Sequence, residues 1–555
     1  MEGKNKGIFF TRGWLWWKRA ETNPGREAAR VSALAEGGRM MERFKILVRQ
    51  FWVLGPIAFV AFCVLFAPFA KAAGLPQYGG VMKMIDVAEG AQPIGVPWEV
   101  RGVDSDLMKP VIESLIREDM KGGYHPWLAT GWKIDQVKNT ITLSLRKGVK
   151  FHDGTDFNAR AAKWCLDHAI EAKTVAGFLS VDIIDDYTIR INLDKYRNTH
   201  LNVLAQSVCN MISPTAYEKN GKEWAEWHPV GTGAFKFVSF ERGSKVTYAK
   251  WDGYWQKGRP YLDGIEYLLI RDPMTQMAAM RSSGPDKVQV LYMNSGEQAT
   301  MMKGMGFKII FGPVGATSLI PDSANADSPL SKKKVREAVS LAIDRNAIVK
   351  ARGFGFWSPT LQIPSSQNPG YVASLGTGRY DPKKARQLLA EAGYPNGFKI
   401  KLIVMPALVD KDAVVAVQRF LGEVGIQCEL EFPDGGGYMN YRFKNGWHNA
   451  FLVHAVRMLA TTNIYNDFMW NTPSMFPSLK RPDGFLDKVH KSLETLMPEK
   501  SKMEELIRIQ ADDLMFIPLY NVSEIYVIQP NVHDTGFLEW SPSTVCTPEA
   551  MWLSK

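Results

Sequence analysis

The sequence predicts an α/β fold on three observations. Residues 140–146 and 185–193 alternate polar and apolar side chains, which is the period of half-buried strands. Residues 158–171 and 330–350 instead space their apolar side chains as amphipathic helices do. Residues 398–404 and 428–432 read as strands, and a helix that ends at Gly425 lies between them, which is the order of a β–α–β unit.

Local signals mark the start and end of another helix. Asp381 accepts hydrogen bonds from free N–H groups at a helix start, and Pro382 fits the first helical position. Gly393 is the glycine expected just beyond the end of that helix. A further short strand is predicted at residues 81–85.

Composition excludes several classes of protein. The chain has 555 residues, of which 46% are apolar and 22% charged, so a chain disordered throughout is excluded. Only one apolar stretch is long enough to span a bilayer, which excludes a polytopic membrane protein. The net charge is +10, but residues 1–72 hold 12 Lys or Arg against 5 Asp or Glu. Because the remainder is nearly balanced, we expect no nucleic-acid partner.

Residues 1–72 read as a leader whose apolar core is residues 51–70. Basic residues precede this core, and the small-x-small triplet Ala70-Lys71-Ala72 follows it. We therefore expect a signal peptide cleaved after Ala72 and a periplasmic or cell-surface protein, with a membrane anchor at 51–70 as the alternative. Cys63 lacks the preceding small residue of a lipobox, so no lipid anchor is predicted.

The apolar core lies unusually far from Met1. We expect translation to begin at Met40 or Met41, which would make residues 1–39 an over-extended reading frame; a genuine cytoplasmic tail is the alternative.

Four cysteines remain after the expected cleavage, namely Cys165, Cys209, Cys428 and Cys546. They allow three disulfide pairings in an oxidising compartment, and their spacings match no known framework. Buried free thiols are the expected state for most of them.

Five blocks of sequence carry a resemblance to a known family. They are residues 145–159 (LRKGVKFHDGTDFNA), residues 229–236 (PVGTGAFK), residues 254–263 (YWQKGRPYLD), residues 335–345 (VREAVSLAIDR) and residues 380–395 (YDPKKARQLLAEAGYP). In this order they resemble the family 5 extracellular solute-binding proteins of ABC importers, which include oligopeptide-, dipeptide- and nickel-binding members.

The resemblance implies a bilobal fold of the periplasmic-binding-protein type II class, in its large cluster with an extra subdomain. Two lobes would be joined by a hinge. We expect an N-terminal lobe with an inserted subdomain at 73–325, a C-terminal lobe at 326–528 and a segment at 529–555 that returns to the first lobe.

The implied function is capture of a peptide or related small organic solute, which a monomer delivers to the transmembrane subunits of an ABC permease. No catalytic step, metal or cofactor is expected. A secreted hydrolase of unrelated mechanism, or a sensory or adhesive binding protein without transport, are the alternatives.

Most residues of the five blocks have a structural interpretation. His152 and Asp153 precede Gly154, and Asp-Gly favours a tight turn over a catalytic pair. The glycines at 231–233 and 435–437 lack the Lys of a phosphate loop and are predicted as turns or backbone near the hinge. We expect Arg336 and Asp344 to form ion pairs at the surface or between lobes.

The segment near residues 450–470 should supply ligand contacts. In peptide-binding relatives an Asp there takes the α-amine of the peptide, but residues 450–458 contain none. Arg457 suits a carboxylate or phosphate group instead, and Arg457→Ala should then weaken binding by about 2–4 kcal/mol. An Arg457 that bridges lobes or faces water is the alternative.

The other candidate ligand-binding residues are aromatic or histidine side chains, each of which could instead have a packing role: Trp98, Trp357, Tyr438, His454, Tyr465 and Trp470. His454 alone does not make a nickel site.

Overall fold

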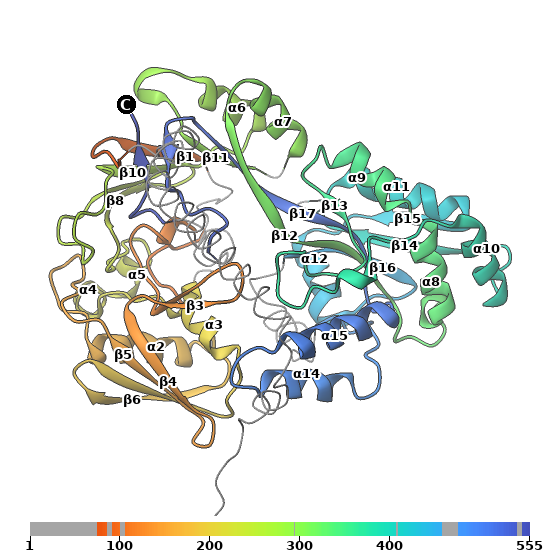
Figure 1. The fold of residues 1–555 in the computed structure, drawn as a ribbon, viewed down its shortest axis with the longest axis horizontal. Coiled ribbons are helices and arrows are strands. Elements are labelled where there is room, and N and C mark those ends of the chain that lie inside the picture. The colour runs from red at the N-terminus through yellow and green to blue at the C-terminus, as the bar shows by residue number, and fades with distance from the viewer. Residues whose placement is uncertain are drawn as a thin grey trace, which may run out of the picture. The chain divides into compact units, whose positions relative to one another are not determined.

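The computed structural model describes residues 75–85, 92–99, 106–293, 295–406, 409–457, 475–540 and 547–555. The expected leader, Met40 and Met41 therefore lie outside the described residues. Residues Pro76–Lys555 form one compact unit, whose largest sheet contributes to two separate groups of elements, here called the N-terminal and C-terminal lobes (Figure 1).

The N-terminal lobe is built on β1 (Val81–Ile85), which confirms the strand predicted there. β1 lies parallel to β10 (Gly264–Leu268) and β11 (Val290–Met293), and β9 (Lys245–Lys250) and β8 (Phe235–Glu241) extend the sheet antiparallel. Val532, Phe537 and Met551 from the C-terminal segment are buried in the same hydrophobic core as Met82.

A four-stranded antiparallel sheet forms the inserted subdomain of this lobe. Its strand order is β4 (Ala129–Asp135), β5 (Thr140–Leu145), β7 (Thr188–Leu193) and β6 (Phe178–Asp185). Helix α2 (Ala159–Glu171) packs on it, and the Asn158 side chain caps α2 by accepting hydrogen bonds from the N–H groups of Arg160 and Ala161. Both predicted strands and the predicted helix are confirmed here.

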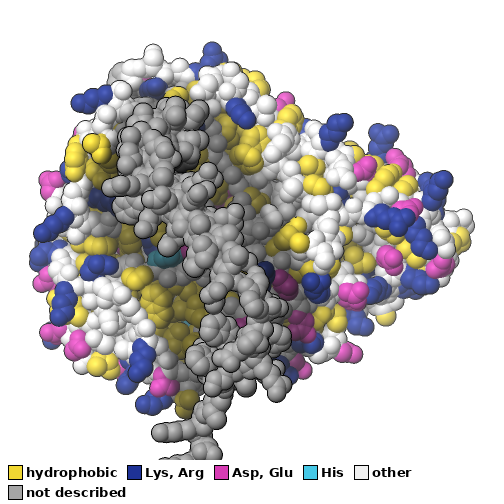
Figure 2. All heavy atoms as spheres, viewed as in Figure 1, with side chains coloured by type: hydrophobic (Ala, Val, Ile, Leu, Met, Phe, Trp, Pro, Cys, Tyr) yellow, Lys and Arg dark blue, Asp and Glu magenta, His cyan; other side chains and the backbone are white. Residues whose placement is uncertain are grey.

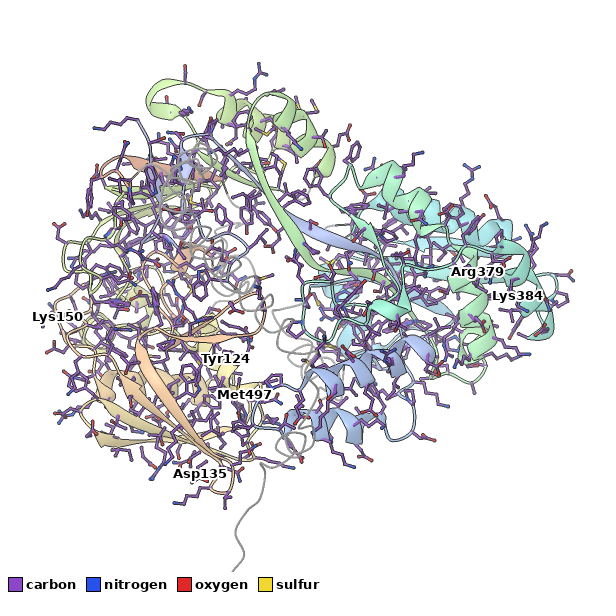
Figure 3. The ribbon with its side chains drawn as sticks, viewed as in Figure 1. Tyr124, Asp135, Lys150, Arg379, Lys384 and Met497 are labelled. Carbon is purple, nitrogen blue, oxygen red and sulfur yellow. The ribbon has the colours of Figure 1, made fainter. Side chains whose placement is uncertain are left out.

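The C-terminal lobe contains the predicted β–α–β unit. β14 (Phe398–Val404) and β15 (Ile426–Glu431) are parallel, and α11 (Lys411–Glu423) connects them. β16 (Ala450–Arg457) pairs with β14 on its other side. Helix α10 (Pro382–Glu391) begins after Asp381, which accepts from the N–H of Lys384, and Gly393 follows its end as predicted. Figure 3 labels Lys384 in this helix.

Two long strands run through both lobes. β12 (Lys308–Pro321) and β17 (Ile517–Ile528) lie antiparallel (Figure 1). The β17 end near Ile528 pairs with β11 in the N-terminal lobe, whereas the β12 end near Pro321 pairs with β16 in the C-terminal lobe. The register shifts between Pro313 and Gly315, where an extra residue interrupts the ladder. Such a bulge bends a strand locally, and it lies where the pairing of β12 with β16 begins.

The single helix predicted at 330–350 is two helices, α8 (Lys333–Ala342) and α9 (Arg345–Arg352). Ile343 is extended and Asp344 caps α9 by accepting from the N–H of Ala347, so the chain restarts instead of continuing. The expected ion-pair roles are also wrong in part. Asp344 is this cap, and Arg336 is buried inside the C-terminal lobe, where it contacts Asp513 at 3.2 Å.

The glycines at 435–437 do not form a turn. They open α12 (Gly435–Asn440), because Asp434 accepts from the N–H of Gly437 and caps the helix. Among the described residues, the remaining α-helices and strands are β2 (Ile116–Glu118), β3 (Tyr124–Pro126), α3 (His200–Ala205), α4 (Pro214–Asn220), α5 (Lys222–Ala225), α6 (Pro273–Arg281), α7 (Gly296–Gly304), β13 (Ser358–Pro359), α14 (Phe485–Leu493), α15 (Lys500–Asp512), β18 (Val532–His533) and β19 (Trp552–Leu553).

We call β12 and β17, which run through both lobes, the hinge strands. Away from them, the inserted subdomain contacts the end of α14. This interlobe contact joins residues 136 and 195–198 to residues 492–496. Asn198 donates from its backbone N–H to the Leu493 carbonyl and from its side chain to the Ser492 carbonyl, both at 2.8 Å. The Tyr196 hydroxyl donates to the Leu496 carbonyl at 2.8 Å. In Figure 3, Met497 marks the C-terminal-lobe side of the contact and Asp135 the neighbouring end of β4.

Three of the expected cysteines are described, and all are free thiols. Cys165 and Cys209 are buried and Cys428 is partly buried, whereas Cys546 lies outside the described residues. Burial raises the pKa of the Cys165 thiol to about 12. In the described part of the chain, no helix is long and apolar enough to cross a membrane. Basic and acidic side chains intermingle on the visible described surface (Figure 2).

Candidate functional site

A cavity of about 560 Å³ lies beside the register shift in β12. β12, β16 and β17 supply part of its wall, and the start of α7, the end of α9 and the loop that follows α9 supply more. Its lining residues include Glu297, Val314, Thr317, Arg352, Phe354, Trp357, Asp410, Met439, Arg442, His454, Tyr520, Val522 and Glu524. Because the hinge strands form this wall, a molecule held here contacts the elements that a lobe movement would displace.

Two stacked aromatic rings contribute to the cavity wall. Trp357 stacks on Tyr520 with ring centroids 4.3 Å apart and planes 7° from parallel. Tyr520 is fully buried, and burial raises the pKa of its hydroxyl well above the usual range. Stacked rings of this kind offer apolar area with little loss of side-chain entropy on binding.

The cavity carries charges of both signs. Glu297, Asp410 and Glu524 contribute carboxylates, and Arg352 and Arg442 contribute guanidiniums. Arg352 pairs with Asp410 at 2.9 Å, and Asp410 also caps α11 by accepting from an N–H. This mixture fits a solute that has both donor and acceptor groups better than it fits a simple anion or cation.

His454 and Tyr438 are joined at the same wall. The Tyr438 hydroxyl lies 2.8 Å from His454 Nδ1 and 2.9 Å from the Val453 carbonyl oxygen. Burial, with the nearby Arg442 guanidinium, lowers the pKa of His454 to about 3. The ring is therefore neutral at physiological pH.

The sequence-predicted site residues divide into three groups. Trp357 and His454 line the cavity, and Tyr438 contacts His454 from behind. Trp98 instead packs in the core of the N-terminal lobe, where its ring centroid is 5.8 Å from that of Trp164.

The other three candidates lie wholly or partly outside the described residues. Arg457 ends β16, and its backbone pairs with Gly315 at the register shift, but its side chain lies outside the described residues. Tyr465 and Trp470 lie outside them entirely. Their role in binding stays a prediction.

Sequence reasoning missed the cavity residues of β17 and of the neighbouring helices. Glu524 had a readable signal, since it is the single charged residue in the mostly apolar run from Ile517 to Ile528. Arg352 and Arg442 had none, because basic residues near helix ends are ordinary at a protein surface.

Several residues of the sequence blocks surround a buried carboxylate in the N-terminal lobe, that of Glu113, and hydrogen-bond to it. Thr232, Tyr254 and Trp255 all donate hydrogen bonds to Glu113, at 2.8, 2.9 and 3.0 Å respectively. Desolvation raises the pKa of Glu113 to about 7 despite these donors. His152 contacts the Gly233 carbonyl at 2.8 Å. These contacts give the residues of the second and third sequence blocks a structural role in the N-terminal lobe.

No group of three or more His, Cys, Asp or Glu residues in the described ranges could hold a metal ion.

Comparisons with known proteins agree with this architecture. A family model described as "Bacterial extracellular solute-binding proteins, family 5 Middle" matches residues 123–474. The chain is 36% identical over 319 residues to the glutathione-binding protein GsiB of Shigella flexneri serotype 5b, a match that covers 56% of this chain and 61% of that relative. The chain thus spans less than two thirds of the length of that relative.

Solved structures share the fold. The periplasmic binding protein DppA of Helicobacter pylori, solved with the peptide STSA, has a TM-score of 0.71 at 21% identity and covers 86% of this chain and 99% of its own. NikA of Brucella suis, solved with Fe(III)-EDTA, has a TM-score of 0.74 at 20% identity and covers 85% of this chain and all of its own. With five blocks in order, two lobes on shared strands and a family model that matches most of its length, this chain belongs to the family 5 bacterial extracellular solute-binding proteins.

Proposed function

We propose that this chain is the extracytoplasmic solute-binding component of an ABC import system. It captures a peptide or related small organic solute between its two lobes and delivers it to the transmembrane subunits of the permease. It acts as a monomer in the periplasm or at the cell surface, exported by its leader, and has no catalytic step of its own. The division of lobes at about residues 325 and 528 belongs to this proposal.

The observation that carries the proposal is the position of the cavity. Its wall includes Val314, which lies within the register shift of β12, and Val522 of the partner strand β17. A solute that fits only one arrangement of these strands shifts the lobes towards that arrangement. A volume of about 560 Å³ also falls in the range of small-molecule sites.

The mixed charge of the cavity supports a zwitterionic solute. Peptides carry both charges together with backbone amides, and glutathione, the solute named for GsiB, is itself a modified tripeptide.

A thermal-shift screen of the full chain tests the proposal. The panel contains di- to pentapeptides, their N-acetylated forms, reduced glutathione, opine-like acids and nickel complexes. A solute present at 100 times its Kd should stabilise the folded protein by about 2.7 kcal/mol. A shift with peptides or glutathione is the expected result. A shift with nickel complexes alone would overturn the peptide class, and no shift with any member would overturn the proposal.

A further inference from the structure

The two ring nitrogens of His454 have different surroundings. The Tyr438 hydroxyl has a single proton and makes two short contacts, to His454 Nδ1 and to the Val453 carbonyl oxygen. A carbonyl oxygen can only accept, so the hydroxyl proton goes to Val453. The hydroxyl oxygen then accepts from the ring, which requires the proton of the neutral imidazole to sit on Nδ1.

The second nitrogen, Nε2, is therefore a bare acceptor. The ring is 5% exposed and lines the cavity. Among the described residues Nε2 has no hydrogen-bond partner, whereas Nδ1 is occupied by Tyr438. Nε2 is accessible from the cavity, so a bound molecule that supplies a donor replaces water at this acceptor, and one that leaves it unpaired pays for its desolvation.

Arg442 limits which donor fits. It lines the same cavity, and its positive charge acts on His454. An ammonium group beside a guanidinium is repelled, and a carboxylate oxygen would meet the Nε2 lone pair. An uncharged amide avoids both conflicts, because its N–H can face Nε2 while its carbonyl faces the guanidinium.

We propose that His454 Nε2 accepts a hydrogen bond from a backbone amide N–H of the bound solute, so that this position selects a peptide bond. The inference rests on the proposed function and narrows its solute class. Tyr438 acts as a positioning residue, because it fixes the ring proton on Nδ1 without touching the solute.

A matched pair of probes tests the proposal without any substitution. Trialanine is compared with its two depsipeptide analogues, in each of which one amide N–H is replaced by an ester oxygen. Calorimetry on the full chain should give a Kd about 10- to 100-fold weaker for one of the two esters, because that ester leaves Nε2 unpaired. The Kd of the other ester measures the general effect on affinity of replacing an amide by an ester.

Two variants assign the effect to His454. His454→Phe keeps a planar ring of similar shape and should reduce the amide-to-ester ratio to about 1. Tyr438→Phe frees the ring proton to move to Nε2, so it should reduce the ratio partly, and nitrogen NMR of the labelled ring should show the change of protonated nitrogen.

The outcomes separate the two claims. Equal Kd values for trialanine and both esters in the wild-type chain would overturn this inference and leave the proposed function standing. An ester penalty that persists in His454→Phe would assign the amide contact to another residue and would also overturn it. No binding of trialanine and of both esters would contradict selection of a peptide bond at this position, whereas the proposed function is judged by the whole thermal-shift panel.

Discussion

Asn198 lies in the interlobe contact, and each hydrogen bond that its substitution would remove can be named. The Asn198 side chain donates to the Ser492 carbonyl at 2.8 Å and to the Thr495 hydroxyl at 3.0 Å. Asn198→Ala removes both bonds but keeps the backbone bond from residue 198 to the Leu493 carbonyl. Each lost bond is worth about 1 kcal/mol net. We therefore expect the contact to weaken by about 2 kcal/mol, which is about 30-fold in its opening equilibrium.

Amide hydrogen exchange measures this opening directly, because the N–H of residue 198 is itself bonded across the contact. Exchange at residue 198 should be about 30-fold faster in Asn198→Ala than in the wild-type full chain. Asn192→Ala is the matched control, since the Asn192 side chain donates to Ser180 and Asp182 within the inserted sheet. An Asn198→Ala chain that exchanges at the wild-type rate would refute the claim that this side chain joins the lobes.

Three further predictions concern binding and stability. Trp357→Ala should weaken solute binding about tenfold, because the cavity loses a stacked ring, whereas Trp224→Ala, which removes a stacked ring outside the cavity lining, should not change the Kd in calorimetry. The pKa of His454 is lower in the folded than in the unfolded chain, so stability falls as pH drops below about 6.5. Between pH 7 and pH 5, the free energy of unfolding measured in urea should fall by about 2 kcal/mol more in the wild type than in His454→Gln, and equal losses would contradict the neutral ring. Arg345→Ala should lower the free energy of unfolding by about 3 kcal/mol at an unchanged m-value, because the buried Pro518 carbonyl loses its donor at 2.8 Å; a loss under about 1 kcal/mol would contradict this.

Local sequence signals predicted the elements whose causes are local. Period-two alternation located β5 and β7, and the Asn158 and Asp381 caps located the starts of α2 and α10. The break at Asp344 was missed because an apolar stripe continues across it, although Asp is a strong capping residue. The glycines at 435–437 were misread because three glycines disfavour a helix unless a cap and tertiary packing support it.

The cavity could not be predicted, because it depends on pairing between distant segments. The bulge in β12 arises against β17, about 200 residues later in the chain. Trp357 was nominated as an aromatic side chain, but its partner Tyr520 lies in a strand that reads as an ordinary buried run. The tautomer of His454 depends on Tyr438, 16 residues away, and spacing alone gives no sign of that contact.

The measurement that tests the central claim most directly is differential amide exchange of the full chain with and without the panel member that gives the largest thermal shift. If the solute is held at the hinge-side cavity, exchange should slow at residues 350–357 and 517–524, which supply Trp357 and Tyr520 to its wall. Binding that leaves both segments at their unliganded exchange rates would contradict the account.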